Sequence, residues 1–165
     1  AVVRAWAFYR RYGRDLVKMS EHAVLNSNYL RHKIMNPDSE VADKILCMPK
    51  EGAESELVMH EFTLSLSPVK DLNGVTGKDV AKRLLDYGYM SPTLYFPQIV
   101  PECLMIEPTE TESKEVLDKF AADFHSILSE DPEIVTTAPH STPVKRVDEV
   151  WAARNLVLRH PIGEK

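Results

Sequence analysis

Two short apolar runs, each ending at a proline and each adjoining a helix signal, constrain the fold of this chain more than any other feature. The first run follows Gly88 and covers residues 89–97, and the second covers residues 104–108. Residues 94–100 and 103–106 predict two short strands, and the tight connection Pro101-Glu102 between them favours antiparallel neighbours. We therefore expect an antiparallel sheet of short strands with helices beside it.

Hydrophobic periodicity predicts further elements on the N-terminal side of these runs. Apolar or small residues at spacings of three and four predict helix over residues 2–34, interrupted at Gly13. The predicted stripe consists of Leu16, Met19, Ala23, Ser27, Leu30 and Ile34. The sequence Asn36-Pro37-Asp38 should end the helix. A weakly periodic connector with at most a short strand or turn near residues 45–48 leads to a half-buried strand over residues 57–66.

The remaining helices are indicated by their capping signals. Thr76 and Asp79 form a capping-box pattern that predicts a helix over residues 77–87, ended by Gly88. Thr109 or Thr111 should open the longest well-marked helix, which Pro132 should end. Its predicted apolar stripe consists of Val116, Leu117, Phe120, Phe124, Ile127 and Leu128.

These elements predict an α+β fold with two layers, an antiparallel sheet with helices packed on one side. We expect three parts: an N-terminal helical segment over residues 1–36, the α+β core over 37–132, and an extended tail over 133–165 with a short helix near 148–154. Trp151, Leu156 and Leu158 in this tail are too hydrophobic to remain in water, so we expect a neighbouring domain or subunit to cover them.

Composition excludes several classes of function. The net charge of −5 gives no cationic surface for nucleic acid or acidic membranes. Cys47 and Cys103 form no CxxC pair, which favours a reducing cytoplasm over a disulfide framework. No apolar run of membrane-spanning length and no signal peptide is present, so we expect no membrane association. The chain starts without methionine inside a helical pattern, which predicts a fragment of a longer protein.

Two common site types are not indicated by the motifs. Gly74-Val75-Thr76-Gly77-Lys78 lacks the spacing of a phosphate loop and is interpreted as a turn before a capped helix. The six histidines show no spacing typical of metal ligands, so we expect no metal site. The histidines are His22, His32, His60, His125, His140 and His160.

Several sequence blocks, in order along nearly the whole chain, carry a resemblance to a known family. They lie at residues 22–30, 59–62, 79–88, 89–97, 104–113 and 139–144. Together they resemble the C-terminal region of the glycine decarboxylase family, the P-protein of the glycine cleavage system, in the second subunit of its two-subunit bacterial form. Met90 stands where that family often has histidine, so no imidazole role is assigned there.

The resemblance implies the small C-terminal domain of a fold-type I pyridoxal-phosphate enzyme. The implied reaction decarboxylates glycine and passes the aminomethyl group to the lipoyl arm of H-protein, with subunit 1 as a partner and an oligomeric full enzyme. In that family the cofactor lysine follows a histidine and precedes a glycine-rich run. Lys33 follows His32 but no such run follows, so Lys33 is interpreted as a solvated helix lysine. We expect the cofactor lysine in a missing upstream region, and neither cofactor nor catalytic residues in this fragment.

Five residues are candidates for facing the cleft of the full enzyme. They are His60, Thr93, Glu107, Thr109 and His140. Structural explanations compete for four of them: His60 as a buried, hydrogen-bonded core residue, Thr93 in a rigid turn, and Glu107 and Thr109 in capping or dipole compensation of the following helix. His140 is included by resemblance alone.

A regulatory module is the alternative hypothesis. The order strand, helix, strand, strand, helix also suits a ferredoxin-like, ACT-type domain that binds an amino acid. That fold would need another strand, for which only residues 133–137 are available, and it would leave the N-terminal helical segment unexplained.

Overall fold

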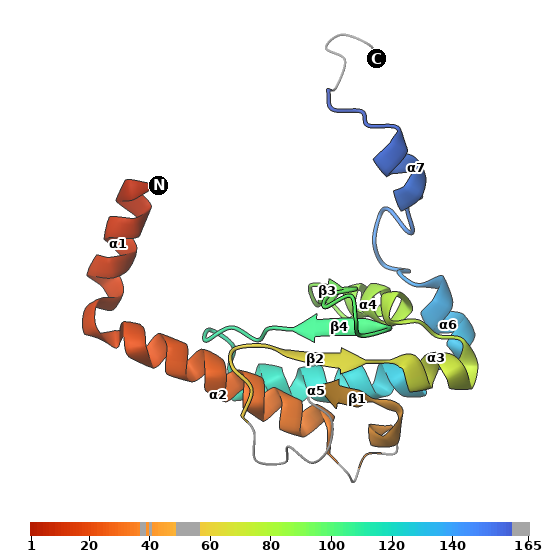
Figure 1. The fold of residues 1–165 in the computed structure, drawn as a ribbon, viewed down its shortest axis with the longest axis horizontal. Coiled ribbons are helices and arrows are strands. Elements are labelled where there is room, and N and C mark those ends of the chain that lie inside the picture. The colour runs from red at the N-terminus through yellow and green to blue at the C-terminus, as the bar shows by residue number, and fades with distance from the viewer. Residues whose placement is uncertain (37–38, 40, 49–56, 160–165) are drawn as a thin grey trace.

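The structure, a computed structural model, describes residues 1–36, 39, 41–48 and 57–159. The fold contains one short-stranded sheet with helices packed beside it (Figure 1). In chain order the elements are α1 (Val2–Tyr12), α2 (Leu16–Ile34), β1 (Leu46–Met48), β2 (Phe62–Ser65), α3 (Ser67–Asn73), α4 (Gly77–Asp86), β3 (Thr93–Leu94), β4 (Cys103–Ile106), α5 (Lys114–Ser129), α6 (Pro132–Thr137) and α7 (Glu149–Arg154).

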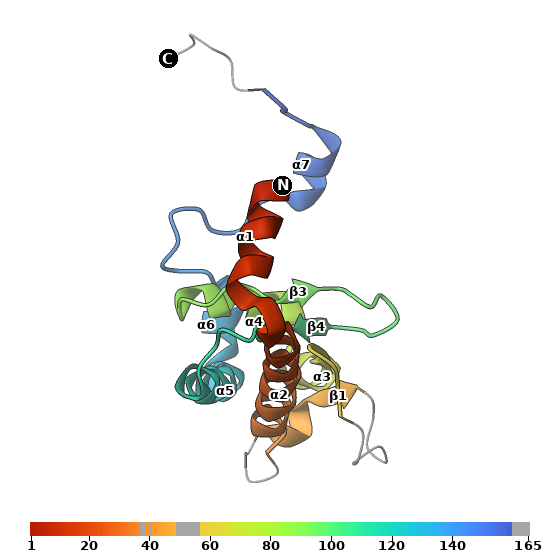
Figure 2. The same ribbon diagram turned by 90° about the vertical axis from the view of Figure 1, so that its left-hand side faces the viewer.

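The sheet has the strand order β1-β2-β4-β3, and every neighbouring pair is antiparallel. Leu64 of β2 lies between Cys47 of β1 and Leu104 of β4, and Leu104 in turn pairs with Leu94 of β3. Because residues opposite each other share a face, these four side chains define the core face of the sheet. Figure 2 shows α2, α4 and α5 on one side of this sheet. The predicted two-layer α+β fold is confirmed.

The core lies between that face and the helices. Fully buried side chains come from both layers, among them Ile34, Leu64, Leu84, Leu104 and Phe124. The stripe predicted on α2 is buried only in its C-terminal half, at Ser27, Leu30 and Ile34. After Gly13, with a φ of 52°, the chain changes direction, and α1 points away from the body without a buried residue. The predicted interruption at Gly13 is therefore confirmed.

The strand predicted over residues 103–106 is confirmed as β4, but two other predicted strands are too long. The strand expected over 57–66 covers only Phe62–Ser65, because the backbone of Val58 pairs with the Asn28 side chain instead of a strand. The strand expected over 94–100 is reduced to Thr93–Leu94. Tyr95 and Glu102 adopt positive φ angles of 60° and 49°, which end the extended backbone, so residues 95–102 form the connection to β4.

Two helices were not predicted, and one predicted helix starts later than expected. Residues 67–73 form α3, and residues 132–137 form α6 rather than an extended tail, with Asp131 as its N-cap and Val135 buried. The longest helix of the core begins at Lys114, because the Ser113 hydroxyl, rather than Thr109 or Thr111, accepts the bond from the Val116 backbone. The acidic residue in its first turn is Glu115, so the dipole role expected for Glu107 is wrong.

The local signals were more accurate. The Thr76–Asp79 capping box is complete, α4 ends at Asp86, and α7 lies where a short helix was expected. The helix terminator expected at Pro37 and Asp38 lies outside the described residues. No helix among the described residues is both long and apolar enough to cross a membrane.

The C-terminal tail is partly attached to the domain. Trp151, Leu156 and Leu158 are exposed, as predicted, and α7 stands away from the body (Figure 1). The segment between α6 and α7 is attached to the domain, contrary to the extended tail that the sequence predicted. Pro139 is fully buried, and Arg146 donates hydrogen bonds to the Asp79 carboxylate (2.6 Å) and to the Ala138 carbonyl (2.7 Å).

Candidate functional site

A groove of about 350 Å³ lies between the N-terminal half of α2 and two segments beside the sheet. The first of these segments precedes β2 and the second follows β4. Three of the five predicted site residues, His60, Glu107 and Thr109, line this groove. Its other walls are Met19, Ser20, Ala23, Val24, Met59, Pro108 and Glu110. The lining thus combines apolar side chains, here called the floor, with polar side chains that include Glu107 and Glu110, here called the acidic rim.

The antiparallel pairing of β2 with β4 brings the two segments together. Phe62 begins β2 opposite Ile106, the last residue of β4. The chain before Phe62 and the chain after Ile106 therefore leave the sheet at the same end, which places His60 beside Glu107. This proximity depends on strand register, because 47 positions separate the two residues in the sequence.

Two asparagines of α2 hold these segments. The Asn28 amide donates to the Val58 carbonyl (2.8 Å) and accepts from the Val58 backbone N–H (2.9 Å). The Asn26 amide donates to the carbonyls of Thr109 (2.8 Å) and Glu112 (3.1 Å). Neither asparagine was predicted from the sequence to be functional. A signal was available, because asparagine is a poor helix former and two of them inside one helix indicate a tertiary role.

The imidazole of His60 lies between two carboxylates at the rim. Its Nε2 is 3.9 Å from Oε2 of Glu61 and 3.9 Å from Oε1 of Glu107. The His60 side chain is 53% exposed, so the expectation of a buried core histidine is wrong. At these distances neither carboxylate holds the imidazole in a close ion pair. The exposed carboxylate of Glu107 is therefore available to a cation that enters the groove.

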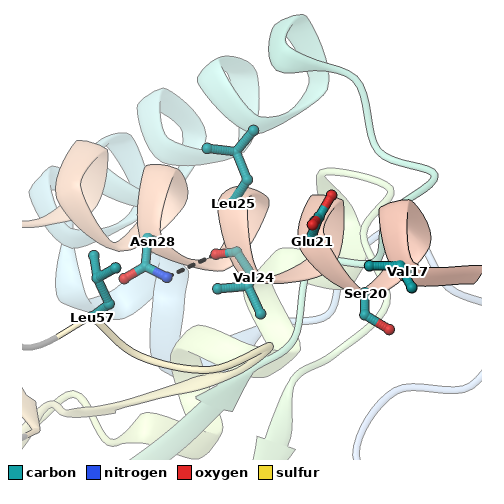
Figure 3. A pocket seen from close by; sticks show the side chains of 7 residues that line it. All are labelled: Val17, Ser20, Glu21, Val24, Leu25, Asn28 and Leu57. Carbon is teal, nitrogen blue, oxygen red and sulfur yellow. Dashed lines mark hydrogen bonds between the residues drawn. The ribbon is translucent and has the colours of Figure 1, made fainter.

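A second cavity of about 460 Å³ adjoins the groove along α2 (Figure 3). It shares Ser20 and Val24 with the groove. Its further lining residues are Val17, Glu21, Leu25, Asn28 and Leu57. In Figure 3 the Asn28 side chain lies between Val24 and Leu57, and its hydrogen bond to the Val24 carbonyl is drawn. α2 therefore presents a largely apolar surface beside the acidic rim.

Thr93 lies outside the groove. It begins β3 at the edge of the sheet, opposite Met105, and is exposed. Because Leu94 is on the core face, Thr93 is on the opposite face. The sheet therefore does not bring Thr93 together with His60, Glu107 and Thr109 as residues lining one cavity.

His140 lies in a different polar cluster, where α4 meets the residues after α6. Its Nε2 is 3.0 Å from the Thr137 hydroxyl, which donates its own proton to the Glu133 carbonyl. Its Nδ1 is 3.4 Å from the Arg83 guanidinium, which can only donate. Both ring nitrogens therefore bond within the chain.

Asp86 organises this second cluster. One carboxylate oxygen accepts from the backbone N–H groups of His140 and Ser141 (both 2.7 Å) and from the Ser141 hydroxyl (2.8 Å), and the other accepts from Arg83 (3.0 Å). Burial by itself would raise the pKa of Asp86. The hydrogen bonds from Ser141, His140 and Arg83 outweigh burial and lower this pKa to about 2. The carboxylate fixes the start of the tail against α4.

Comparison with known proteins decides which family this arrangement represents. Residues 19–146 match the family model described as "Glycine dehydrogenase, C-terminal domain". That range contains the groove and both asparagines. The chain belongs to this family. The matched range covers most of α2 and extends beyond α6, to the Arg146 that bonds Asp79.

Named relatives agree with the glycine dehydrogenase family. The chain is 45% identical over 160 residues to a probable glycine dehydrogenase (decarboxylating) subunit 2 of Aquifex aeolicus, covering 95% of this chain and 31% of the relative. A protein with the same description from Coxiella burnetii is 43% identical over 169 residues, which cover 99% of this chain and 32% of the relative. The chain therefore spans about one third of the length of these relatives.

Family membership decides between the two hypotheses from the sequence. The glycine dehydrogenase interpretation is supported, and the ACT-type regulatory module is not. The structure agrees, because residues 133–137 would have to supply a further strand of a ferredoxin-like sheet and instead belong to α6.

Proposed function

We propose that this chain is the C-terminal part of a glycine decarboxylase that acts in a glycine cleavage system. In the full enzyme it would help to convert glycine to carbon dioxide and an aminomethyl group carried by the lipoyl arm of H-protein. The match of residues 19–146 to the family model, together with relatives at 43–45% identity over nearly the whole chain, carries this proposal.

We assign to this chain the binding of substrate and the shaping of the catalytic cleft, and not the central bond-breaking step. His60, Glu107 and Thr109 face the catalytic cleft, where the acidic rim stabilises a cationic amino group and the apolar floor excludes water. Thr93 and His140 remain candidates for contact with other parts of the enzyme. Partners are subunit 1 and H-protein, and the full enzyme is an oligomer in the cytoplasm. Cys47 and Cys103 are both buried, and their spacing in the sequence suggests no disulfide framework, which is compatible with a reducing compartment.

Pyridoxal phosphate is the cofactor that the family implies, and it would supply the electron sink for decarboxylation. Two helix N-termini of this chain, those of α4 and α5, do not suit its phosphate. At the N-terminus of α4, the carboxylate of Asp79 accepts from the Thr76 backbone and that of Glu102 from the Gly77 backbone. Ser113 caps α5, and the carboxylate of Glu115 accepts from its own backbone N–H. A phosphate at either terminus would meet a carboxylate. The cofactor site is therefore proposed for the rest of the enzyme.

The first experiment compares this chain alone with a full-length protein that contains it. The chain, incubated with pyridoxal phosphate and reduced with borohydride, should give no stable adduct at one specific lysine. A full-length protein that contains the chain should give such an adduct and release labelled carbon dioxide from carboxyl-labelled glycine when a lipoyl carrier is present. A specific, stoichiometric adduct on the chain, or no release by the full-length protein, would contradict the proposal.

The second experiment tests the groove. In the full-length protein, His60→Gln, Glu107→Gln and Thr109→Val should each lower aminomethyl transfer, with the cofactor absorbance unchanged. His32→Gln is the matched control, because His32 is an exposed histidine of α2 outside the groove. Full activity in all three groove variants would show that the site lies elsewhere, even where the first experiment succeeds.

A further inference from the structure

The two walls of the groove beside the sheet lie outside the strand ladder. The pairing of β2 with β4 starts at Phe62 and ends at Ile106, and α5 begins at Lys114. Residues 57–61 and 107–112 therefore have no strand to set their position. Their backbones are tied to α2 instead, through Asn28 at Val58 and through Asn26 at Thr109 and Glu112.

Both amide hydrogens and the amide oxygen of Asn28 form hydrogen bonds. One amide hydrogen is directed to the Val58 carbonyl and the other to the Val24 carbonyl of its own helix (2.7 Å), while the amide oxygen accepts from Val58. The pair of bonds to Val58 reproduces the exchange between residues of adjacent antiparallel strands. α2 thus replaces a missing strand neighbour two residues before His60.

Asn26 acts on the other segment as a double donor. Its Nδ2 donates to the carbonyls of Thr109 and Glu112, which lie three residues apart in the segment that leads into α5. These two bonds hold Thr109, which lines the groove, at a fixed position relative to α2. Asn26 and Asn28 therefore connect a single rigid helix to both walls.

We propose that Asn26 and Asn28 are positioning residues that set the placement of His60, Glu107 and Thr109 in the groove. The proposal rests on the groove function proposed above, but its structural part can be tested independently. The required chemistry is that of an amide. An aspartate has the same shape but presents oxygen atoms to the carbonyls of Val58, Thr109 and Glu112, and it cannot donate.

The first test measures amide hydrogen exchange in the chain. Asn28→Asp should speed exchange in residues 57–61 at least tenfold, and Asn26→Asp should do the same for residues 107–112. Asn28→Leu, which removes the polar group without adding charge, should act like Asn28→Asp. Glutamine at either position keeps donor and acceptor and should restore part of the protection.

Asn73→Asp is the matched control. This variant replaces an asparagine by an aspartate of the same shape and adds the same negative charge. The Asn73 side chain, however, acts as an acceptor for the Val75 backbone N–H, and an aspartate can still accept that bond. Exchange in both groove segments should be unchanged in this variant. Unchanged exchange in Asn26→Asp or Asn28→Asp would overturn the positioning role, and so would equal acceleration in the Asn73 control.

The second test measures transfer of the aminomethyl group by a full-length protein. Asn26→Asp and Asn28→Asp should lower the rate about tenfold with the cofactor absorbance retained, and the glutamine variants should recover part of the loss. Activity retained in the His60, Glu107 and Thr109 variants would refute the groove function alone. Activity lost in those variants but retained in both aspartate variants would refute the positioning role alone.

Discussion

The groove around His60 and the cluster around Asp86 use polar side chains in different ways. Asp86 is 6% exposed and gathers four hydrogen bonds of 2.7–3.0 Å from α4 and from the start of the tail. His60 and Glu107 are more than half exposed, and the two groups come no closer than 3.9 Å. Closely bonded, buried charges contribute to folding stability, whereas exposed charges at longer distances contribute little and remain available to another molecule.

Removal of the Asp86 carboxylate should have the largest effect on stability. Asp86→Ala leaves the Arg83 guanidinium without one of its partners and removes the acceptor for three donors of His140 and Ser141. We expect a loss of about 3 kcal/mol in the free energy of unfolding, measured by urea denaturation. Asp71→Ala on the exposed side of α3 should change it by less than about 0.5 kcal/mol. Equal losses in both variants would remove the contrast between buried and exposed carboxylates.

Acid titration should reveal the same cluster. The pKa of Asp86 is about 2 in the folded chain, below its ordinary value of 3.8, so the folded state favours the ionised carboxylate. Its contribution, roughly 2 kcal/mol, is complete above pH 4–5 and is lost as the pH falls through 3.8 toward 2. Unfolding free energies of the wild-type chain and Asp86→Asn should therefore converge toward pH 2. A constant difference between pH 6 and pH 2 would contradict the assignment.

His60→Gln should affect activity in the full-length protein rather than folding stability. The side chain is half exposed and forms no close ion pair, so the free energy of unfolding should change by less than about 0.5 kcal/mol. In the full-length protein the rate of aminomethyl transfer should fall about tenfold, which corresponds to about 1.4 kcal/mol in the activation barrier. A large loss of stability with unchanged transfer would make His60 a structural residue like Asp86.

The smallest effect is expected in the exposed arm that begins at α7. Leu156→Ser and Leu158→Ser should leave the free energy of unfolding of the chain within about 0.5 kcal/mol, because both side chains are already in solvent. Val135→Ala, at a buried position of α6, should cost about 1 kcal/mol or more. A cost for the leucine variants close to that of Val135→Ala would indicate that the arm folds back onto the domain in solution.

The sequence determined the local structure and the family. Some features depend only on residues that are neighbours in the sequence, so they can be predicted without the tertiary structure. They are the capping box at Thr76 and Asp79, the break at Gly13 and the family blocks. The sequence also supplied the three groove residues, from their places in or beside predicted strands and from the family resemblance. The sequence predicted both ends of β4 but not the start of β2, because the exchange of bonds between Asn28 and Val58 competes with strand pairing across 30 positions.

Only the tertiary structure separated the five candidates into different environments. Strand register placed His60 beside Glu107, and the edge position of β3 left Thr93 on the opposite face of the sheet from the core. The two ring nitrogens of His140 bond within the cluster formed by Thr137 and Arg83. Such assignments depend on contacts between residues tens of positions apart, and periodicity along the chain carries no information about which distant groups will meet.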